Sequence, residues 1–215
     1  MANHKQQIKM IQIKNLSIQL NKKTIINNIS YTFDTWSCTA IIGNNGAGKT
    51  CLLQSIIGQI KPSKGTINCD SSISYAPDAL PLPSWLNPNI LRKNEPQAEF
   101  FAKKTRRTTN QNTAYQKLSQ GNKQKINLIN SLCYQANIYI RDEPTQHLDP
   151  ESRYAIHTII KELKQQKKTI IYSTHFLEDI WHHTDQCIIL DQGSIQHTID
   201  NPTNNKTLQS YFQRN

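Results

Sequence analysis

The sequence predicts one α/β domain whose core is a mainly parallel β-sheet flanked by helices. Short apolar segments alternate with segments of helical hydrophobic spacing through the second half of the chain, which is typical of a parallel sheet with covered faces. A glycine-rich loop at residues 43–50 joins a strand-like segment to a helix-like one. The chain has 215 residues, of which 36% are hydrophobic and 19% charged, so it can bury one sizeable core.

The beginning of the chain has the composition and turn residues of β-strands. We expect strands at Ile8–Ile13, Ser17–Leu20, Thr24–Tyr31 and Cys38–Ile42. Polar segments at 21–23 and 34–35 are expected to be the turns between them. Apolar residues then recur with helical spacing from Leu52 to Ile57, and Gly58 closes this helix. The local order is therefore strand, glycine loop, helix.

The remainder of the chain divides into a proline-rich stretch and an alternating α/β part. Prolines and asparagines interrupt regular structure between Pro77 and Pro96, which makes this stretch a natural place for a subdomain or an insertion. Further expected elements are helices at Ala98–Lys104, Gln120–Tyr134, Glu151–Gln166 and near Phe176, and strands at Ile138–Ile140, Thr169–Ser173, Cys187–Leu190 and Ser194–Thr198. The sequence shows no internal repeat and no flexible linker, so we expect a single domain over 1–215.

Composition narrows the class of protein. No segment approaches the roughly 18 apolar residues that span a bilayer, and the mean hydropathy is −0.63. We therefore expect a soluble, cytoplasmic protein that lies on a membrane only through a partner. Residues 1–10 are polar and lack the apolar run of a secretory signal. The five cysteines form no CxxC pair, which favours reduced thiols over a zinc site or a disulfide framework.

The chain is basic, with a formal net charge of +10. Such a charge suits a partner that carries phosphate, for example nucleic acid or an anionic membrane surface. The basic residues are nevertheless spread along the chain, and the one local cluster, at 103–107, is more typical of a solvated helix face. Lys, Asn, Gln and Ile are abundant throughout, which indicates a bias of the whole sequence. We therefore expect no specific nucleic acid partner.

The glycine-rich loop matches the phosphate-binding pattern GxxxxGK[ST] at every fixed position. It comprises Gly43, Asn44, Asn45, Gly46, Ala47, Gly48, Lys49 and Thr50. Its glycines let consecutive backbone N–H groups point at phosphates, and the following helix offers its positive end. Lys49 is expected to reach the β- and γ-phosphates of ATP, and Thr50 to coordinate Mg²⁺. A chance glycine-rich turn is the alternative, and the position between a strand and a helix argues against it.

A phosphate-binding loop of this type needs a carboxylate from a neighbouring strand to hold magnesium. Asp142 follows the expected strand at 138–140 and is the candidate metal ligand. Glu143 lies one residue further and is placed to accept a proton from the attacking water as general base. An acidic turn after a strand is the alternative, and the glycine loop argues against it. Arg141 is unusual in this strand, because a buried charge needs a partner.

At this point the chain resembles the ABC ATPase family over nearly all of its length. Residues 118–122, with the sequence LSQGN, resemble the LSGGQ signature of that family and precede a helix and the magnesium strand. Residues 142–149, DEPTQHLD, are similar to its DEPT motif and D-loop. Ser173-Thr174-His175 stands where the family has its switch histidine. Four motifs in the same order make the combination specific.

The resemblance implies a P-loop NTPase of the ABC type. Its fold adds an N-terminal antiparallel β subdomain and a short helical subdomain, here expected at 84–134, to the parallel core. Two subunits, identical or different, are expected to pair head to tail on binding ATP and Mg²⁺. Ser119 and Gly121 of one subunit then bind the γ-phosphate held by the loop of the other, His175 contacts it from its own subunit, and Asp149 helps to join the two sites. The resemblance also implies that a transmembrane permease is the partner that uses this hydrolysis.

The sequence also departs from the family pattern. Leu20 stands where an aromatic ring usually stacks on adenine, so base affinity is expected to fall by ~1 kcal/mol. Asp78 stands where the family has the glutamine of its Q-loop, and it is a third candidate metal ligand with Thr50 and Asp142. Gln120 and Asn122 replace a glycine and a glutamine in the signature. ATP binding is therefore a safer expectation than brisk turnover.

Three functions remain open on the sequence. The first is the energy-coupling subunit of a transporter, in which the proline-rich and helical region grips a membrane partner. The second is an ABC protein that acts on ribosomes, DNA or cluster assembly without transport. The chain has neither the second ATPase domain nor the long coiled coil that such proteins carry. The third is a module that holds ATP without cleaving it, which Leu20 and Asp78 favour and the retained Lys49, Glu143 and His175 oppose.

Overall fold

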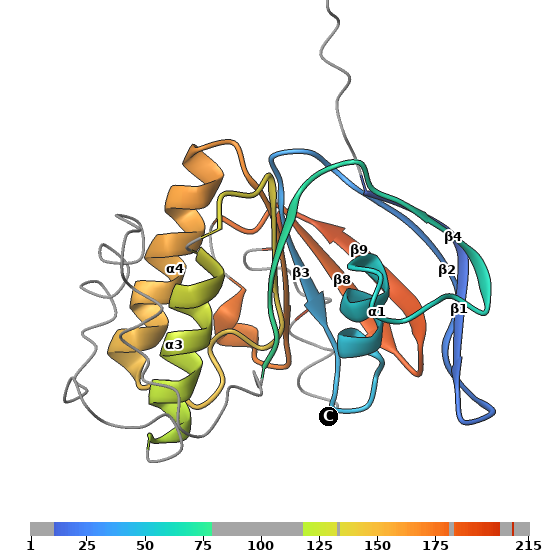
Figure 1. Ribbon diagram of the computed structural model, residues 1–215, viewed down its shortest axis with the longest axis horizontal. Coiled ribbons are helices and arrows are strands. Elements are labelled where there is room, and N and C mark those ends of the chain that lie inside the picture. Colours follow the sequence, from blue (N-terminus) through green and yellow to red (C-terminus); the bar gives the residue numbers. More distant parts are fainter. Residues whose placement is uncertain (1–10, 79–117, 133, 181–182, 203–207, 209–215) are drawn as a thin grey trace, which may run out of the picture.

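Two β-sheets with helices between and beside them make up the protein (Figure 1). The computed structural model describes residues 11–78, 118–132, 134–180, 183–202 and 208. A three-stranded sheet has the order β2-β1-β4, and a six-stranded sheet has the order β5-β6-β7-β3-β8-β9. Among the residues described, no helix has both the length and the apolar character required to cross a lipid bilayer.

The smaller sheet is antiparallel and begins with a long hairpin. β1 (Ile11–Leu20) pairs with β2 (Lys23–Phe33), and the two-residue turn between them has positive φ at Asn21 and Lys22, as the twist of such hairpins requires. The separate strands expected at Ile8–Ile13 and Ser17–Leu20 belong, over the described residues, to the single strand β1. The register shifts between Ile13 and Leu16, where Asn15 has φ 49°, so the apparent break is a β-bulge.

Two strands have no counterpart among the elements expected from the sequence. β4 (Lys64–Asn68) pairs antiparallel with β1, and β5 (Ile73–Ala76) pairs parallel with β6. Most residues of β4 are exposed, so it lacks the apolar alternation by which a strand is recognised. β5 is only four residues long. Both strands are therefore defined by their partners and not by their own pattern.

The larger sheet confirms the mainly parallel core. Strands β3 (Cys38–Ile42), β6 (Ile138–Arg141), β7 (Thr169–Thr174) and β8 (Gln186–Asp191) run parallel, and β9 (Ser194–Asp200) is antiparallel at one edge. The helices are α1 (Lys49–Ile56), α3 (Gln120–Leu132) and α4 (Pro150–Gln165). Each agrees with an expected helix to within a few residues, except that α1 starts three residues before its first apolar position.

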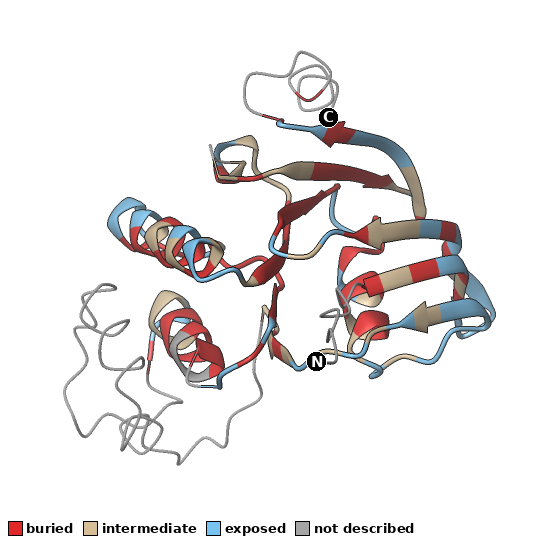
Figure 2. Cartoon of the chain, turned by 90° about the horizontal axis from the view of Figure 1, so that it is seen from above, coloured by how far each residue is buried: buried red, intermediate tan, exposed pale blue. Residues whose placement is uncertain are grey.

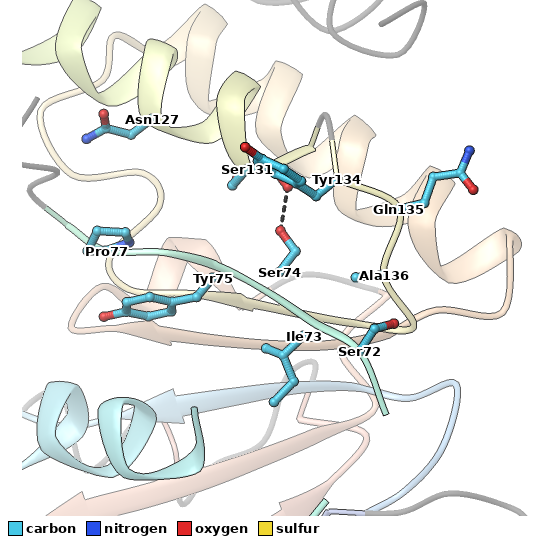
Figure 3. Close-up of a pocket in the computed structure, with 10 residues that line it drawn as sticks. All are labelled: Ser72, Ile73, Ser74, Tyr75, Pro77, Asn127, Ser131, Tyr134, Gln135 and Ala136. Atoms are coloured by element: carbon cyan, nitrogen blue, oxygen red, sulfur yellow. Dashed lines mark hydrogen bonds between the residues drawn. The ribbon is translucent and has the colours of Figure 1, made fainter. Parts of the chain in front are cut away.

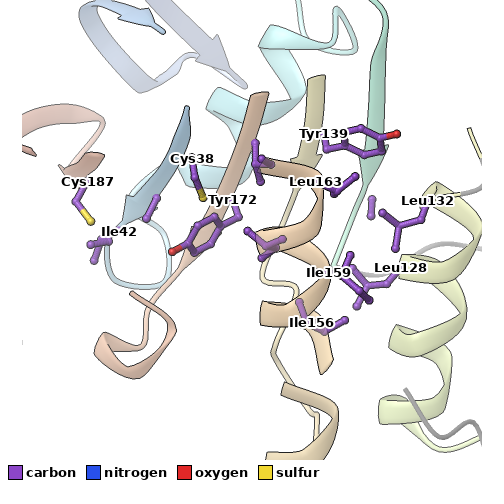
Figure 4. Close-up of a cluster of buried hydrophobic side chains, with 14 of the residues drawn as sticks. Cys38, Ile42, Leu128, Leu132, Tyr139, Ile156, Ile159, Leu163, Tyr172 and Cys187 are labelled. Carbon is purple, nitrogen blue, oxygen red and sulfur yellow. The ribbon is translucent and has the colours of Figure 1, made fainter. Parts of the chain in front are cut away.

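Each face of the six-stranded sheet has its own apolar core. α1 lies between the two sheets, where Leu52, Leu53 and Ile56 pack against the interior of the antiparallel sheet (Figure 1). α3 and α4 cover the opposite face, and Figure 4 shows their aliphatic side chains against Tyr172 and Cys38 of the sheet. The central strands are consequently buried from both sides (Figure 2). This rigid sheet fixes the loops that follow its strands.

One expected helix is shorter in the structure, and other expected segments lie partly or wholly outside the described residues. The helix expected near Phe176 is a single 3₁₀ turn, η3 (Leu177–Asp179), because the chain leaves helical geometry again at Ile180. The strand expected from Ile8 is described only from Ile11. The helix at Ala98–Lys104 and most of the helical subdomain at 84–134 lie outside the described residues, and α3 is the part of that subdomain that is described.

Arg141 is buried in β6 without a carboxylate among the residues described. Its Nη1 donates to the carbonyl oxygens of Ser74 and Ile140, at 3.0 and 2.8 Å, and its guanidinium lies 5.2 Å from the ring centroid of Tyr139. Burial lowers the pKa of Arg141 to about 9. The partner expected for this charge is therefore a pair of carbonyl groups and an aromatic face.

Candidate active site

The loops after β3, β6 and β7 meet at one edge of the larger sheet. In the order β6-β7-β3 these are neighbouring parallel strands, so their carboxyl ends lie at the same edge. β3 leads into the loop at 43–50, β6 into Asp142 and Glu143, and β7 into His175. Three segments that are far apart in the sequence thus lie together at this edge.

The phosphate-binding loop has the backbone that its glycines allow. Gly46 and Gly48 have φ of 84° and 104°, a region that other residues rarely adopt. A Cβ on Gly48 would lie 2.8 Å from Cδ1 of Ile26, so the loop is also packed closely on β2. Gly193, in the turn before β9, donates its N–H to the carbonyl of Ala47 at 3.0 Å. Contacts from β2 and from the turn before β9 therefore hold the loop in place at the start of α1.

Lys49 is buried within this loop and makes three polar contacts. Its Nζ donates to the carbonyl oxygens of Gly43 and Asn44, at 2.6 and 3.3 Å, and lies 3.0 Å from Oε1 of Glu143. Its side chain is 6% exposed. The ammonium group thus faces the glycine loop on one side and the candidate general base on the other, where a negatively charged phosphate can exchange with the carboxylate.

Asp142 is buried behind the loop. Its backbone N–H donates to Ala76 at 2.9 Å, and its Oδ1 accepts a hydrogen bond from Oγ of Ser173 at 2.5 Å. Burial raises the pKa of Asp142, against which hydrogen bonds from the hydroxyl groups of Ser173 and Thr50 lower it. A divalent cation favours the ionised carboxylate in the same way as these donors do. The carboxylate oxygen and the Thr50 hydroxyl are the hard oxygen ligands that Mg²⁺ prefers.

Glu143 and His175 are in direct contact. Oε2 of Glu143 lies 2.8 Å from Nδ1 of His175, and Oε1 is the atom that pairs with Lys49. Glu143 has φ 47°, and two hydrogen bonds to its main chain hold this turn. Its N–H donates to Oγ of Ser173 at 2.9 Å, and its carbonyl accepts from Nε2 of Gln124 at 3.1 Å. Glu143 therefore has both of its carboxylate oxygens directed at charged or ionisable groups of the site.

The signature motif lies at the surface, at the start of α3. Ser119 is exposed, and its Oγ accepts a hydrogen bond from the N–H of Asn122 at 3.3 Å. A Cβ on Gly121 would lie 2.7 Å from the carbonyl oxygen of His147, so only glycine allows the D-loop to approach so closely. Asp149 caps α4 through the N–H of Ser152. The start of α3 is exposed at Ser119 and Gln120 and partly exposed at Gly121.

Asp78 is half-buried just after β5. With the amide of Gln146 oriented to donate, its nitrogen lies 3.0 Å from Oδ1 and 3.3 Å from Oδ2 of Asp78. Burial raises the pKa of Asp78, and the nearby charges of Asp142 and Glu143 raise it further. The carboxylates of Asp142 and Glu143 therefore disfavour the ionised form of Asp78.

Sequence reasoning did not assign roles to Ser173 and Gln124. Ser173 joins Asp142 to the main chain of Glu143, and Gln124 reaches the same turn from α3. Ser173 stands within a quoted motif, but its hydrogen-bond partners depend on β7 lying beside β6. Gln124 is one of many polar residues on an amphipathic helix. No pattern in the sequence distinguishes it.

A separate cavity of about 340 Å³ lies between β5 and the end of α3 (Figure 3). Ser74 and Ser131 face each other across it, joined by a hydrogen bond from Oγ of Ser74 to the carbonyl of Ser131. Its walls contain no lysine, histidine or carboxylate among the residues described. The cavity is therefore distinct from the edge where the phosphate-binding residues meet.

Comparison with known proteins agrees with this geometry. A family model described as "ABC transporter" matches residues 26–146. An uncharacterised ABC transporter ATP-binding protein of Methanocaldococcus jannaschii is 30% identical over 201 residues, which cover 87% of this chain and 76% of that protein. The chain belongs to the ABC transporter family. It is an ATP-binding subunit, whose hydrolysis of ATP powers transport by a separate membrane partner.

Other members of the ABC transporter family show the same likeness. A zinc import ATP-binding protein of Buchnera aphidicola is 30% identical over 191 residues, which cover 84% of this chain and 80% of that protein. A solved structure of the ATP-binding subunit of an ABC transporter superposes with a TM-score of 0.79 at 24% identity, over 90% of this chain and 91% of that one. The latter comparison confirms the ABC ATPase fold.

Proposed function

We propose that the chain binds Mg-ATP in the loop at 43–50 and hydrolyses it through Glu143 and His175. The observation that carries this proposal is the line of contacts from Lys49 to Glu143, at 3.0 Å, and from Glu143 to His175, at 2.8 Å. A phosphate-binding cation, a carboxylate base and a histidine are thus adjacent at the carboxyl ends of three parallel strands. A module that only holds ATP needs the phosphate-binding cation but neither the carboxylate base nor the histidine.

The residues divide the chemistry between them. Lys49 and the loop N–H groups bind the β- and γ-phosphates, which displaces Glu143 from the ammonium group and leaves its carboxylate free to accept a proton from water. His175 holds Glu143 from the other side and is the residue that we assign to the γ-phosphate. Because phosphoryl transfer is mainly positioning and charge stabilisation, this fixed arrangement supplies most of what the reaction needs.

Magnesium fits the donors at the same edge of the sheet. Thr50, Asp142 and Asp78 are the residues that would hold it, and all three offer oxygen atoms. When bound, the ion neutralises charge on the β- and γ-phosphate oxygens. Burial raises the pKa of both Asp142 and Asp78, and nearby carboxylates raise each further, Glu143 for Asp142, and Asp142 and Glu143 for Asp78. A divalent cation would offset this by favouring the ionised forms.

The working unit is a head-to-tail pair of subunits. Ser119 is exposed, and the residues around Gly121 lie at the outer end of α3, so they are accessible to the nucleotide of a second subunit. The pair is expected to sit on the cytoplasmic face of a membrane, bound to a transmembrane permease. The permease selects the cargo, so the zinc import function of one relative does not assign a cargo to this chain.

Mixing two inactive variants tests the shared site. Lys49→Ala damages the phosphate loop, and Ser119→Glu places a carboxylate where the signature meets the γ-phosphate of the other subunit. A mixed dimer contains one intact site, formed by the loop of the Ser119→Glu subunit and the signature of the Lys49→Ala subunit. An equal mixture should therefore release phosphate at about a quarter of the native rate, because half of random dimers are mixed and each has one good site. Phosphate release no greater than the mean of the separate variants would contradict the paired site.

Asp78→Gln tests the placement of the third carboxyl group. Removing a negative charge beside Asp142 and Glu143 lowers the repulsion that the γ-phosphate meets, so phosphate release should rise by about threefold at saturating Mg²⁺. Asp70→Asn removes the same charge from an exposed turn and serves as the control. If the Asp78 variant has the native rate and the native magnesium titration, Asp78 lies outside the site.

A further inference from the structure

Asp179 is a buried carboxylate that the mechanism above does not use. It lies in η3, is 1% exposed, and accepts hydrogen bonds from two threonines. Its Oδ2 accepts from Oγ1 of Thr174 at 2.8 Å and from Oγ1 of Thr145. One oxygen atom of one carboxylate thus joins two segments that are adjacent only in the folded chain.

Each threonine is next to a residue of the reaction. Thr174 immediately precedes His175, and its Oγ1 also accepts the N–H of Phe176 at 3.0 Å, which fixes the backbone on both sides of the histidine. Thr145 lies two residues after Glu143, within the turn that closes when the N–H of Gln146 donates to the carbonyl of Glu143 at 3.2 Å. The carboxylate therefore fixes the segment that carries the base and the segment that carries the histidine.

Burial of the Asp179 carboxylate costs free energy of desolvation, which a purely structural role does not explain. Oδ1 of Asp179 has no hydrogen-bond partner in the described part of the chain, and Nε2 of His157 lies 3.9 Å from it. Burial raises the pKa of Asp179, and the hydroxyl groups of Thr145 and Thr174 lower it again. A buried carboxylate with one unsatisfied oxygen is a poor source of stability, whereas an apolar side chain in its place would avoid the desolvation.

We propose that Asp179 is a positioning residue for ATP hydrolysis, which holds Glu143 and His175 in contact by binding Thr145 and Thr174 with one carboxylate oxygen. This inference rests on the roles proposed for Glu143 and His175. The contact of 2.8 Å between those two side chains joins two loops that are 32 residues apart in the sequence. A second interaction between the same loops is therefore needed to keep the two side chains in contact. Without Asp179 the two turns can shift apart, and a shift of about 1 Å can cost two orders of magnitude in rate.

The test compares five variants of the whole chain by steady-state phosphate release. Asp179→Asn, Thr145→Val and Thr174→Val should each lower kcat by at least about tenfold while the KM for ATP stays within twofold, because the phosphate-binding loop is untouched. Thr145→Ser keeps the hydroxyl group and should therefore retain most of the native kcat. Tyr172→Phe is the matched control, because its hydroxyl donates to the main-chain carbonyl of Asp179 at 2.9 Å and not to the carboxylate.

A double-mutant cycle separates positioning from stability. If Asp179 acts through His175, Asp179→Asn should cost nothing further in a His175→Ala background, since the contact it maintains is already gone. Full additivity, a native kcat in Asp179→Asn, or an equal loss of kcat in Tyr172→Phe would each overturn the proposal. His175→Ala alone must lower kcat for the cycle to be read. If it does not, the proposed role of His175 fails, which is a different result from an additive cycle.

Discussion

Replacing Glu143 with Gln is expected to lower the rate of ATP hydrolysis by about 1,000-fold, the scale of a lost general base. Gln keeps the size of the side chain but cannot accept a proton from water. The same change removes the carboxylate that lies 3.0 Å from Nζ of Lys49. ATP then meets no competing anion at the lysine, so its affinity should be equal to or higher than in the native chain. The variant should hold ATP that it cannot cleave.

Trapped ATP should make the pair of subunits stable enough to observe. We expect sedimentation to show a monomer without nucleotide and a dimer with Mg-ATP for the Glu143→Gln variant. Glu162→Gln, which changes the same charge near the C-terminal end of α4, should behave as the native chain does. A monomer in both conditions would contradict the paired site, and an unchanged rate of phosphate release would remove Glu143 from the mechanism.

The parts of the site that follow from local chain geometry could be predicted from the sequence. The loop at 43–50 needs positive φ at Gly46 and Gly48, and a strand before it and a helix after it define its surroundings. The partners of this loop could be placed by a simple rule, because parallel strands end at the same edge of a sheet. The structure accordingly brings Lys49, Glu143 and His175 into one line of contacts.

The parts that depend on long-range pairing could not be predicted in the same way. The bulge at Asn15 divides one strand into two apparent ones, because the alternation of buried side chains shifts there. β4 is almost fully exposed, and only its pairing with β1 makes it a strand. The hydrogen bonds among the polar groups behind the site also depend on contacts between distant parts of the chain. Asp179 and Thr145 lie 34 residues apart, and no spacing in the sequence predicts their hydrogen bond.

Replacing Lys49 with Ala should weaken ATP binding by at least about 100-fold, which corresponds to about 2.7 kcal/mol. The ammonium group is the buried cation of the loop, and charge-assisted hydrogen bonds of this kind contribute about 1.5–3 kcal/mol each. The loss has a second cause in this protein. Without Lys49, the carboxylate of Glu143 loses its ion pair and keeps, among the described residues, its contact with His175. Its negative charge then repels the bound γ-phosphate.

Equilibrium titration with ATP in the absence of turnover measures this effect, because it separates binding from hydrolysis. Lys64→Ala is the matched control, since it removes the same charge from the exposed strand β4 and should leave the affinity unchanged. The double variant Lys49→Ala with Glu143→Gln isolates the second cause. If repulsion by Glu143 contributes, the double variant should bind ATP more tightly than Lys49→Ala alone. Native affinity in Lys49→Ala would show that the loop at 43–50 does not bind the phosphates, and the proposed function would fail with it.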